Sequence, residues 1–217
     1  MEELTVVQRV AVWALPVLFA ITVHEVAHGW VARRLGDPTA YMLGRLTLNP
    51  LKHIDPVGTV LVPLALTLIG GFIFGWAKPV PVTWENLRHP KRDMALVAAA
   101  GPLANLVMAL LWGLAMKVGV VLADSVPAIA LPLLYMGGAG ISINLVLMVL
   151  NLLPLLPLDG GRVVAGLLPG RLSWQYSRLE PYGLFILLGL LFLGWLGYLL
   201  QPPLALLQSL LFNLLGL

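Results

Sequence analysis

The sequence predicts an all-α polytopic membrane protein, and two properties of its composition carry that prediction. Hydrophobic residues occupy 59% of the 217 positions and charged residues only 11%, whereas about a quarter of the residues in an ordinary soluble domain are charged. The apolar residues are also gathered into long stretches that recur from Val6 to Leu217. A water-soluble globule is therefore excluded, and the lipid bilayer is the expected solvent.

Six apolar stretches are candidate membrane segments, because a helix needs about 20 apolar residues to cross the bilayer. They are 6–31, 57–73, 94–122, 126–153, 182–200 and 204–217. The last is short for a full crossing, and Gln201, Pro202 and Pro203 directly before it predict a tight turn. We therefore expect about five to six transmembrane segments, of which the last is tilted or partial.

The composition also excludes several kinds of partner and site. The net charge of +3 comes from lysines and arginines in short connecting stretches, so no nucleic-acid partner is expected. The chain has no cysteine, which excludes a disulfide framework, a thiolate metal site and a cysteine nucleophile. Residues 1–9 carry two glutamates and one basic residue, so we expect a retained N-terminal segment rather than a cleaved signal.

Two polar connecting stretches contain segments that favour short, membrane-associated β-strands. Tyr41 to Leu48 alternates bulky with small or polar residues, and Ala77 to Trp84 contains two prolines that oppose a helix. In the apolar stretch 126–153, residues 137–140 are Gly-Gly-Ala-Gly, so their side chains are a hydrogen atom or a methyl group. Such small residues fit either a movable part of the helix that admits water to the site or close packing against another helix.

The motif His24-Glu25-Val26-Ala27-His28 lies inside the first apolar stretch. On a helix, residues four apart lie on one face, so both imidazoles can hold one metal ion with Glu25 beside them. Ionisable side chains within a membrane helix cost about 2.5–3.5 kcal/mol each when charged, and a bound dication offsets that cost. The alternative is a buried polar cluster whose members satisfy one another or reach the interface.

A catalytic zinc site needs a third protein ligand, and Asp159 is the candidate. It ends the fourth apolar stretch, after two prolines that break the helix and before Gly160 and Gly161. Non-helical backbone at membrane depth is tolerated only where it is buried in protein or lines a wet cavity. The alternative is an Asp-Gly-Gly turn at the lipid headgroups.

A shared metal requires that the histidine pair and Asp159 lie at the same depth, so the chain between them must cross the bilayer an even number of times. One of the three intervening stretches must then be re-entrant. We expect this of 57–73, the shortest, which Pro63 interrupts and Gly70-Gly71 closes.

This topology places eleven of the thirteen lysines and arginines on one side, which the positive-inside rule identifies as cytoplasmic. They are Arg33, Arg34, Arg45, Lys52, Lys78, Arg88, Lys91, Arg92, Arg162, Arg171 and Arg178. We therefore expect a multi-pass protein with the metal toward the cytoplasmic side, and the expected location is the inner membrane of a prokaryotic cell.

These elements resemble the site-2 protease family of intramembrane zinc metalloproteases. HEVAH at 24–28 is similar to the HExxH motif of that family, and NLLPLLPLDGG at 151–161 to its NxxPxxPxDG element. GPLAN at 101–105 resembles the Gly-Pro start of the helix between them, and HIDPVGT at 53–59 resembles a compact subgroup without PDZ or CBS domains. The resemblance covers roughly residues 8–165. It implies one intramembrane protease domain over 1–217, with C-terminal helices at about 181–217.

The resemblance also implies roles for individual residues. His24, His28 and Asp159 would bind one Zn²⁺ per chain, Glu25 would be the catalytic glutamate, and Asn151 would position substrate or stabilise the oxyanion. The implied substrate is a transmembrane protein. The alternative for Asn151 is an interhelical hydrogen bond like that of Asn144.

Further interpretations stay open at the level of sequence. A substrate helix must be locally extended before attack, and an edge at 41–48 or 77–84 would hold it by strand addition. His53 is either a partner of the site, a gate or an ordinary interfacial loop residue. A membrane transporter or ion-coupled carrier also uses intramembrane histidines and carboxylates, but no repeat of the motif is present. A catalytically silent relative that binds membrane segments is the third alternative.

Overall fold

The computed structural model describes residues 5–61 and 77–217. Regular structure within these ranges is helical. The helices are α1 (Val6–Arg34), α2 (Thr39–Met42), α4 (Pro90–Leu122), α5 (Pro127–Asn151), α6 (Asp159–Leu167), α7 (Gly170–Ser177), α8 (Glu180–Phe192) and α9 (Trp195–Leu215). Short helical turns occupy Pro50–Lys52, Pro56–Leu61 and Trp84–Asn86.

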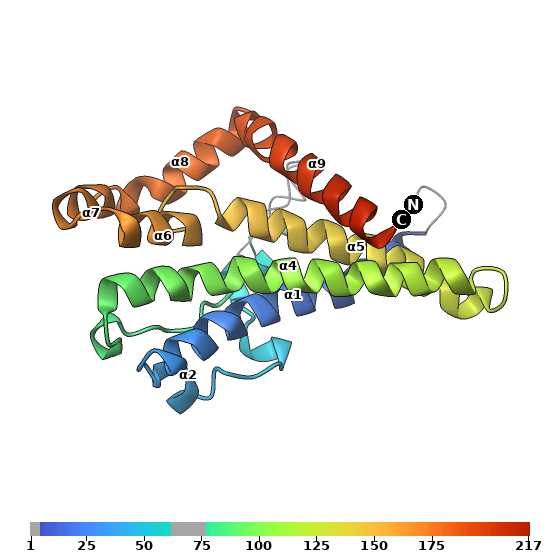
Figure 1. Cartoon of the computed structure of the whole chain (residues 1–217), viewed down its shortest axis with the longest axis horizontal. Coiled ribbons are helices and arrows are strands. Elements are labelled where there is room, and N and C mark those ends of the chain that lie inside the picture. The colour runs from blue at the N-terminus through green and yellow to red at the C-terminus, as the bar shows by residue number, and fades with distance from the viewer. Residues whose placement is uncertain (1–4, 62–76) are drawn as a thin grey trace.

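Helix α4 is the centre of the arrangement. It lies alongside α5 over most of its length, and α1 packs against both (Figure 1). On the other side of α5, helices α8 and α9 meet at an apex, and α9 returns to pack against α5. Helix α6 also packs against α4. The helix that carries His24 and His28 and the helix that begins at Asp159 therefore both lie against α4.

The prediction of a multi-span helical membrane protein agrees with this arrangement. Four described helices are long and apolar enough to cross a bilayer, namely Val7–Arg34, Pro90–Leu122, Pro127–Asn151 and Trp195–Leu215. Glu180–Phe192 is a shorter apolar helix. The predicted count of five to six full or partial spans is thus not confirmed. The predicted re-entrant stretch 57–73 lies mostly outside the described residues.

Small residues bring α4 and α5 close together. A Cβ atom at Gly137 would lie 2.6 Å from the Cβ of Met116, and one at Gly140 would overlap the Trp112 ring. Helices in lipid associate through such close packing, because lipid tails are as apolar as the helix surfaces. Of the two roles that the sequence left open for residues 137–140, the structure therefore favours packing.

The predicted β-strands are not confirmed, because the described residues contain no β-ladder. In the first segment, Tyr41 and Met42 belong to α2. In the second, residues 77–83 are neither helical nor paired. Pro79 and Pro81 have no N–H group, and the N–H groups of Lys78, Val80 and Thr83 bond to His53, Glu25 and Asp37, which explains why this segment forms no ladder within the described chain.

The predicted turn at Gln201–Pro203 is wrong. Helix α9 runs through Pro202 and Pro203, and the chain reverses earlier, at Gly194, whose φ is +74°. Glycine adopts this left-handed conformation without the steric cost that a Cβ atom imposes. Helix α8 therefore ends before the prolines, and α9 is the longer of the two.

Candidate metal centre

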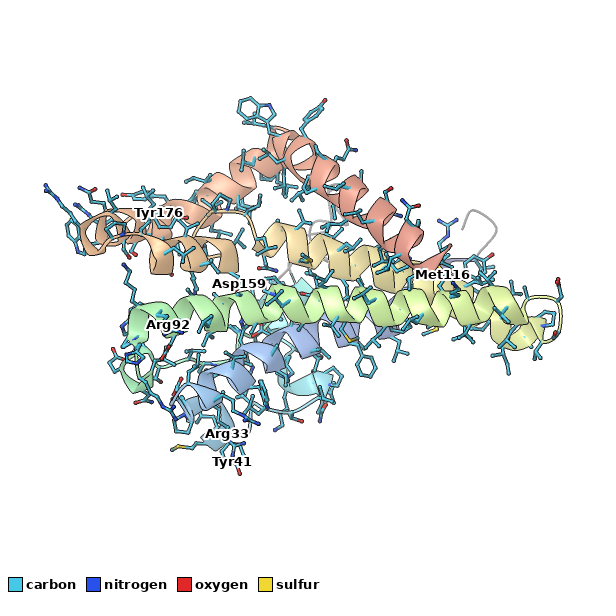
Figure 2. All side chains as sticks on the ribbon, viewed as in Figure 1. Arg33, Tyr41, Arg92, Met116, Asp159 and Tyr176 are labelled. Atoms are coloured by element: carbon cyan, nitrogen blue, oxygen red, sulfur yellow. The ribbon has the colours of Figure 1, made fainter. Side chains whose placement is uncertain are left out.

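Three side chains from α1 and α6 converge beside α4. The Nε2 atoms of His24 and His28 lie 3.2 Å and 3.4 Å from Oδ2 of Asp159, and 3.1 Å from each other. Their possible ligand atoms all lie within 4.8 Å of one another. Figure 2 shows Asp159 in this position, between α6 and α4. The structure thus brings together the three residues that the sequence singled out as metal ligands.

One face of α4 carries the contacts that hold the histidines. Val97, Gly101 and Asn105 are spaced by four residues, so they share that face. Nδ1 of His28 lies 2.7 Å from the Val97 carbonyl oxygen, and Nδ1 of His24 lies 2.6 Å from Oδ1 of Asn105. A Cβ atom at Gly101 would lie 2.5 Å from Nε2 of His28. The glycine therefore leaves room for both imidazole rings.

The fold of the chain before α6 explains the position of Asp159. Helix α5 ends at Asn151, and the loop that follows contains both prolines. A Cβ atom at Gly160 would overlap the Leu152 carbonyl, and one at Gly161 would lie 2.5 Å from the Leu156 nitrogen. The two glycines thus let the start of α6 pack directly against this loop. The Asp159 side chain is 13% exposed and faces the histidines, unlike an aspartate in a headgroup turn.

The hydrogen bonds determine which ring nitrogen of each histidine carries the proton. A carbonyl oxygen only accepts, so Nδ1 of His28 donates to Val97. Nδ2 of Asn105 donates to the carbonyl of Ala20 at 3.2 Å, which turns its Oδ1 toward His24. Because that oxygen also only accepts, Nδ1 of His24 is a donor. In both neutral rings, Nε2 therefore presents a lone pair.

A second asparagine reinforces this orientation. Nδ2 of Asn105 also donates to Oδ1 of Asn144 at 2.9 Å, and Nδ2 of Asn144 donates to the Gly140 carbonyl at 2.8 Å. Both asparagines are fully buried. The interhelical hydrogen bond expected at Asn144 is confirmed, and it links α5 to the ring of His24 through Asn105.

The resulting donor set fits a metal ion. Two Nε2 lone pairs and a carboxylate oxygen face one another, and Oδ2 of Asp159 is buried without a hydrogen-bond partner in the described chain. Facing lone pairs repel unless a proton or a cation lies between them. Two histidines and one carboxylate are a common ligand set of catalytic zinc, which keeps a fourth position open. These residues can therefore hold Zn²⁺.

Glu25 lies beside the three converging side chains without being one of them. Its Oε2 accepts a hydrogen bond from the backbone N–H of Val80 at 2.7 Å, and Val80 belongs to the non-helical segment 77–83. The other oxygen, Oε1, accepts no hydrogen bond from the described residues. One carboxylate oxygen is therefore held by the backbone, and the other has no hydrogen-bond partner among the described residues.

Two further contacts anchor the 77–83 segment. The N–H of Lys78 donates to the His53 carbonyl at 2.9 Å, and the N–H of Thr83 donates to Oδ2 of Asp37 at 2.7 Å. His53 is buried, and its Nε2 lies 2.9 Å from the Thr47 carbonyl. His53 is therefore a buried residue that connects two loops, which was not among the roles considered from the sequence, and its predicted role as a partner of the site or a gate stays a prediction.

Asp37 was not identified by sequence reasoning. It is fully buried and accepts hydrogen bonds from the N–H of Thr39 at 3.0 Å and from Nδ2 of Asn86 at 3.0 Å. Burial raises the pKa of this carboxyl, but the hydrogen bonds from Thr39, Asn86 and Thr83 outweigh burial and hold the pKa below its usual range. An Asp after a helix, followed by Pro-Thr, was the available signal.

Asn151 has a different environment from the one expected of an oxyanion partner. Its Nδ2 donates to the Leu147 carbonyl in its own helix at 2.9 Å. A contact between its amide and the three converging side chains is absent from the described hydrogen bonds. The asparagine that contacts a histidine is Asn105, and its four-residue spacing from Gly101 was the signal that could have identified it.

The chain is similar over most of its length to bacterial proteins. It is 39% identical over 199 residues to "Putative zinc metalloprotease YwhC" of Bacillus subtilis (strain 168), covering 88% of this chain and 84% of that protein. It is 33% identical over 167 residues to "Putative zinc metalloprotease Rip2" of Mycolicibacterium smegmatis. It is 32% identical over 166 residues to Rip2 of Mycobacterium tuberculosis (strain ATCC 25618 / H37Rv).

The two Rip2 proteins are longer than this chain, which spans 54% of their length. No protein-family model matches the chain, and no solved structure matches it. The likeness to YwhC extends over most of both proteins, and the histidines and the aspartate that the family motifs contain lie together in the structure. The chain therefore belongs to the site-2 protease family of zinc metalloproteases.

Proposed function

We propose that this protein is an intramembrane zinc endopeptidase that hydrolyses peptide bonds of transmembrane substrates near the cytoplasmic leaflet. One observation carries the proposal: the ligand atoms of His24, His28 and Asp159 lie within 4.8 Å of one another, although Asp159 lies on α6 and the histidines on α1. The names of the similar proteins support a zinc-dependent protease. The apolar helices support a membrane location.

One zinc ion per chain would be held by Nε2 of His24, Nε2 of His28 and a carboxylate oxygen of Asp159. When bound, such an ion polarises the scissile carbonyl and lowers the pKa of water toward about 7. Val97 and Asn105 keep the two rings in the tautomer that offers Nε2. These contacts orient the ligands before substrate arrives.

Glu25 acts as the general base and then as the general acid. Its Oε1 takes the proton of the attacking water and later delivers it to the leaving nitrogen of the cleaved peptide. Because Oε2 is held by the Val80 N–H, the carboxylate cannot rotate freely during this transfer. In this proposal Asn151 keeps its expected role, which is to contact the substrate backbone once substrate is bound.

The substrate would bind as an unwound segment beside residues 77–83. A transmembrane helix hides its peptide bonds, so cleavage requires local unwinding. The 77–83 segment is non-helical and contacts Glu25 directly. It is therefore the better of the two edges considered for holding an extended substrate backbone.

The expected orientation places the active site toward the cytoplasm of a prokaryotic cell. Arg33 at the end of α1 and Arg92 at the start of α4 lie at the same end of the helices (Figure 2). Most of the other basic residues are in connecting stretches that the predicted topology assigns to that side. The positive-inside rule identifies the side as cytoplasmic.

Zinc content and cleavage of a single-span test substrate, measured on the protein purified in detergent, test the proposal. We expect one zinc per chain for the wild type and for Glu25→Gln, with cleavage lowered at least about 100-fold in Glu25→Gln because the general base is lost. Asp159→Ala should lose zinc and cleavage together. Glu85→Gln, an exposed glutamate outside the site, is the matched control and should behave as wild type.

The alternatives give different results in the same experiment. Stoichiometric zinc without cleavage of any transmembrane test substrate would identify a silent relative. Full activity in Glu25→Gln would remove the proposed base. Absence of zinc together with substrate-independent ion flux in vesicles would favour a carrier.

A further inference from the structure

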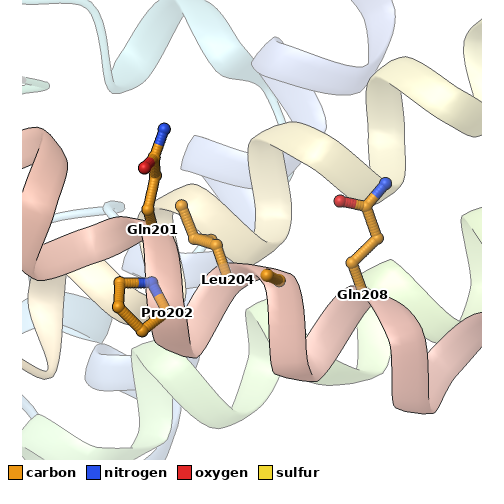
Figure 3. Close-up of a pocket in the computed structure, with 5 residues that line it drawn as sticks. Gln201, Pro202, Leu204 and Gln208 are labelled. Carbon is orange, nitrogen blue, oxygen red and sulfur yellow. The ribbon is translucent and has the colours of Figure 1, made fainter.

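An open cleft with three arginines lies at the end of α1. It has a volume of about 470 Å³ and is lined by Trp30, Arg33, Arg34 and Arg88. None of the three converging side chains of the metal centre lines it. A second cleft, on α9, is lined by uncharged residues, including Gln201 and Gln208 (Figure 3). The cleft at α1 is thus the one whose chemistry points to a charged ligand.

The chain is folded so that Arg88 joins the two arginines of α1. Its backbone N–H donates to the Leu35 carbonyl at 3.1 Å. Gly36, with φ of +116°, lies between the segments, and a Cβ atom there would be 2.9 Å from the Asn86 carbonyl and 3.2 Å from Cγ of Arg88. A side chain at position 36 would therefore push Arg88 away from the end of α1.

Aromatic rings orient two of the guanidinium groups by their faces. Cζ of Arg33 lies 3.7 Å from the centre of the Tyr41 ring, and both side chains are seen together in Figure 2. Cζ of Arg34 lies 4.7 Å from the centre of the Trp30 ring. Stacking uses the face of a guanidinium and leaves its N–H edge available for hydrogen bonds. Within the described chain, neither these two nor Arg88 gives that edge to a hydrogen-bond or ion-pair acceptor.

The nearest carboxylate in sequence does not neutralise the arginines. Asp37 follows α1 by three residues, but it is fully buried and its oxygens accept hydrogen bonds from Thr39, Thr83 and Asn86. Three like charges therefore border one cleft without a counter-charge from the described residues. The negative end of the α1 dipole offsets only part of their repulsion, so an external anion would stabilise this arrangement.

We propose that the cleft binds the phosphate group of an anionic phospholipid. A guanidinium edge matches two phosphate oxygens at once, which makes phosphate the preferred anion. The cleft lies at the last turn of a helix that can span the bilayer, and Trp30 is 52% exposed beside it. Tryptophan with arginine at a helix end is typical of the headgroup layer, where phosphates are part of lipids rather than free in solution.

Binding of short-chain, water-soluble lipids to the full-length protein in a non-ionic detergent tests the proposal. Dihexanoyl phosphatidylglycerol is titrated by calorimetry or native mass spectrometry, next to dihexanoyl phosphatidylcholine and inorganic phosphate at the same ionic strength. We expect phosphatidylglycerol to bind at least about tenfold more tightly than phosphatidylcholine. The phosphate of phosphatidylcholine lies next to the choline cation of the same lipid, and this cation competes with the arginines for the phosphate and is repelled by them.

Substitutions separate a built site from general electrostatic attraction. The triple variant Arg33→Lys, Arg34→Lys, Arg88→Lys keeps the net charge but replaces the planar guanidinium groups by ammonium groups. We expect it to lose the preference for phosphatidylglycerol. The single variant Arg88→Gln should weaken that binding about tenfold and serves if the triple variant does not fold. Arg178→Gln is the matched control, because Arg178 also stacks on a tryptophan, Trp174, at 5.0 Å, but outside the cleft.

Three results would overturn the proposal. The first is equal binding of the two lipids by the wild type, and the second is an unchanged preference in the triple lysine variant. The third is inorganic phosphate binding as tightly as phosphatidylglycerol, which would make free phosphate the ligand. None of these measurements depends on zinc or proteolysis, so the cleft and the proposed enzyme function are tested separately.

Discussion

The backbone N–H of Val80 donates to Oε2 of Glu25 across 2.7 Å, and this bond joins two parts of the chain that are 55 residues apart. It is the direct contact between the proposed general base and the non-helical segment 77–83. The position of that segment and the orientation of the carboxylate are therefore linked.

Replacing Val80 by proline tests this link, because proline removes the N–H donor. A hydrogen bond to a charged group contributes about 1.5–3 kcal/mol, so we expect Val80→Pro to lower the cleavage rate about tenfold or more while zinc content stays unchanged. Val80→Ala, which keeps the N–H, is the control and should retain most activity. Equal rates for the two variants would show that the hydrogen bond does not orient Glu25.

Gly101→Ala is expected to weaken zinc binding. The added Cβ atom would lie 2.5 Å from Nε2 of His28 and 2.6 Å from Cε1 of His24, so the rings must move. A displaced ligand shell typically costs about 10–100-fold in metal affinity, measured here by competition with a chromogenic chelator. Gly138→Ala is the control on the neighbouring helix, because a Cβ atom there meets nothing within 4 Å. Identical affinities for both variants would contradict the close approach of α4 to the histidines.

Asn105→Ala should loosen His24 without removing a proposed ligand. It deletes the acceptor of the His24 Nδ1–H and the bond to Asn144, so Nε2 is no longer the favoured free nitrogen. We expect zinc affinity to fall about 10–100-fold and the nitrogen NMR signals of His24 to report a mixture of tautomers. Asn213→Ala, on an exposed position of α9, is the control. Unchanged tautomer signals would rule out the orienting role of Asn105.

The buried carboxyl of Asp37 predicts a pH-dependent stability difference. Its pKa is lowered from the usual value of 3.8 in the folded chain, so its ionised form stabilises the fold above that value. This contribution is lost as the pH falls through the folded pKa. The gap in melting temperature between wild type and Asp37→Asn should be constant above about pH 5 and shrink below about pH 4. The exposed Asp124→Asn is the control, and a gap that does not change with pH would disprove the assignment.

Removing zinc with a chelator should lower the melting temperature of the wild type in detergent. A ligand that binds only the folded chain stabilises it by about 2.7 kcal/mol at one hundred times its dissociation constant, and the site joins α1 to α6. His24→Ala, which lacks one proposed ligand, should show no further shift with the same chelator. A chelator shift of equal size in this variant would place the metal elsewhere in the chain.

The sequence identified the candidate ligands correctly as neighbours because two kinds of local pattern were available. The four-residue spacing of His24 and His28 sets their relation on any helix. Asp159 was selected because it follows two helix-breaking prolines and precedes two glycines, in backbone expected to be buried in protein or to line a cavity. The structure brings all three within 4.8 Å. The contacts of Asn105 and Asp37 were not predicted, because each depends on which side of one element faces another.

Two predictions made from local sequence, the turn at 201–203 and the strand at 77–84, do not agree with the structure. Pro202 and Pro203 favour a turn, yet α9 continues through them and the reversal occurs at Gly194. Helices in lipid tolerate proline when neighbouring groups satisfy the freed carbonyls, whereas a positive φ is accessible mainly to glycine. The proline-containing segment at 77–84 was expected to be a strand, but its N–H groups are bonded to His53, Glu25 and Asp37 instead.

The amino-acid sequence by itself predicted a multi-pass membrane protein, a metal site without thiolate ligands, and two histidines of one helix as ligands of that site. These properties depend on composition and on spacing along a single helix, which the chain carries wherever it folds. Only the tertiary structure decided the tautomers of the histidines, the bond between Val80 and Glu25, and the cleft formed by three arginines. Each of these requires groups from distant segments to lie side by side, which a pattern along one segment does not specify. Gly101 on α4 leaves room for the imidazole rings, and Gly36 lets Arg88 approach the end of α1.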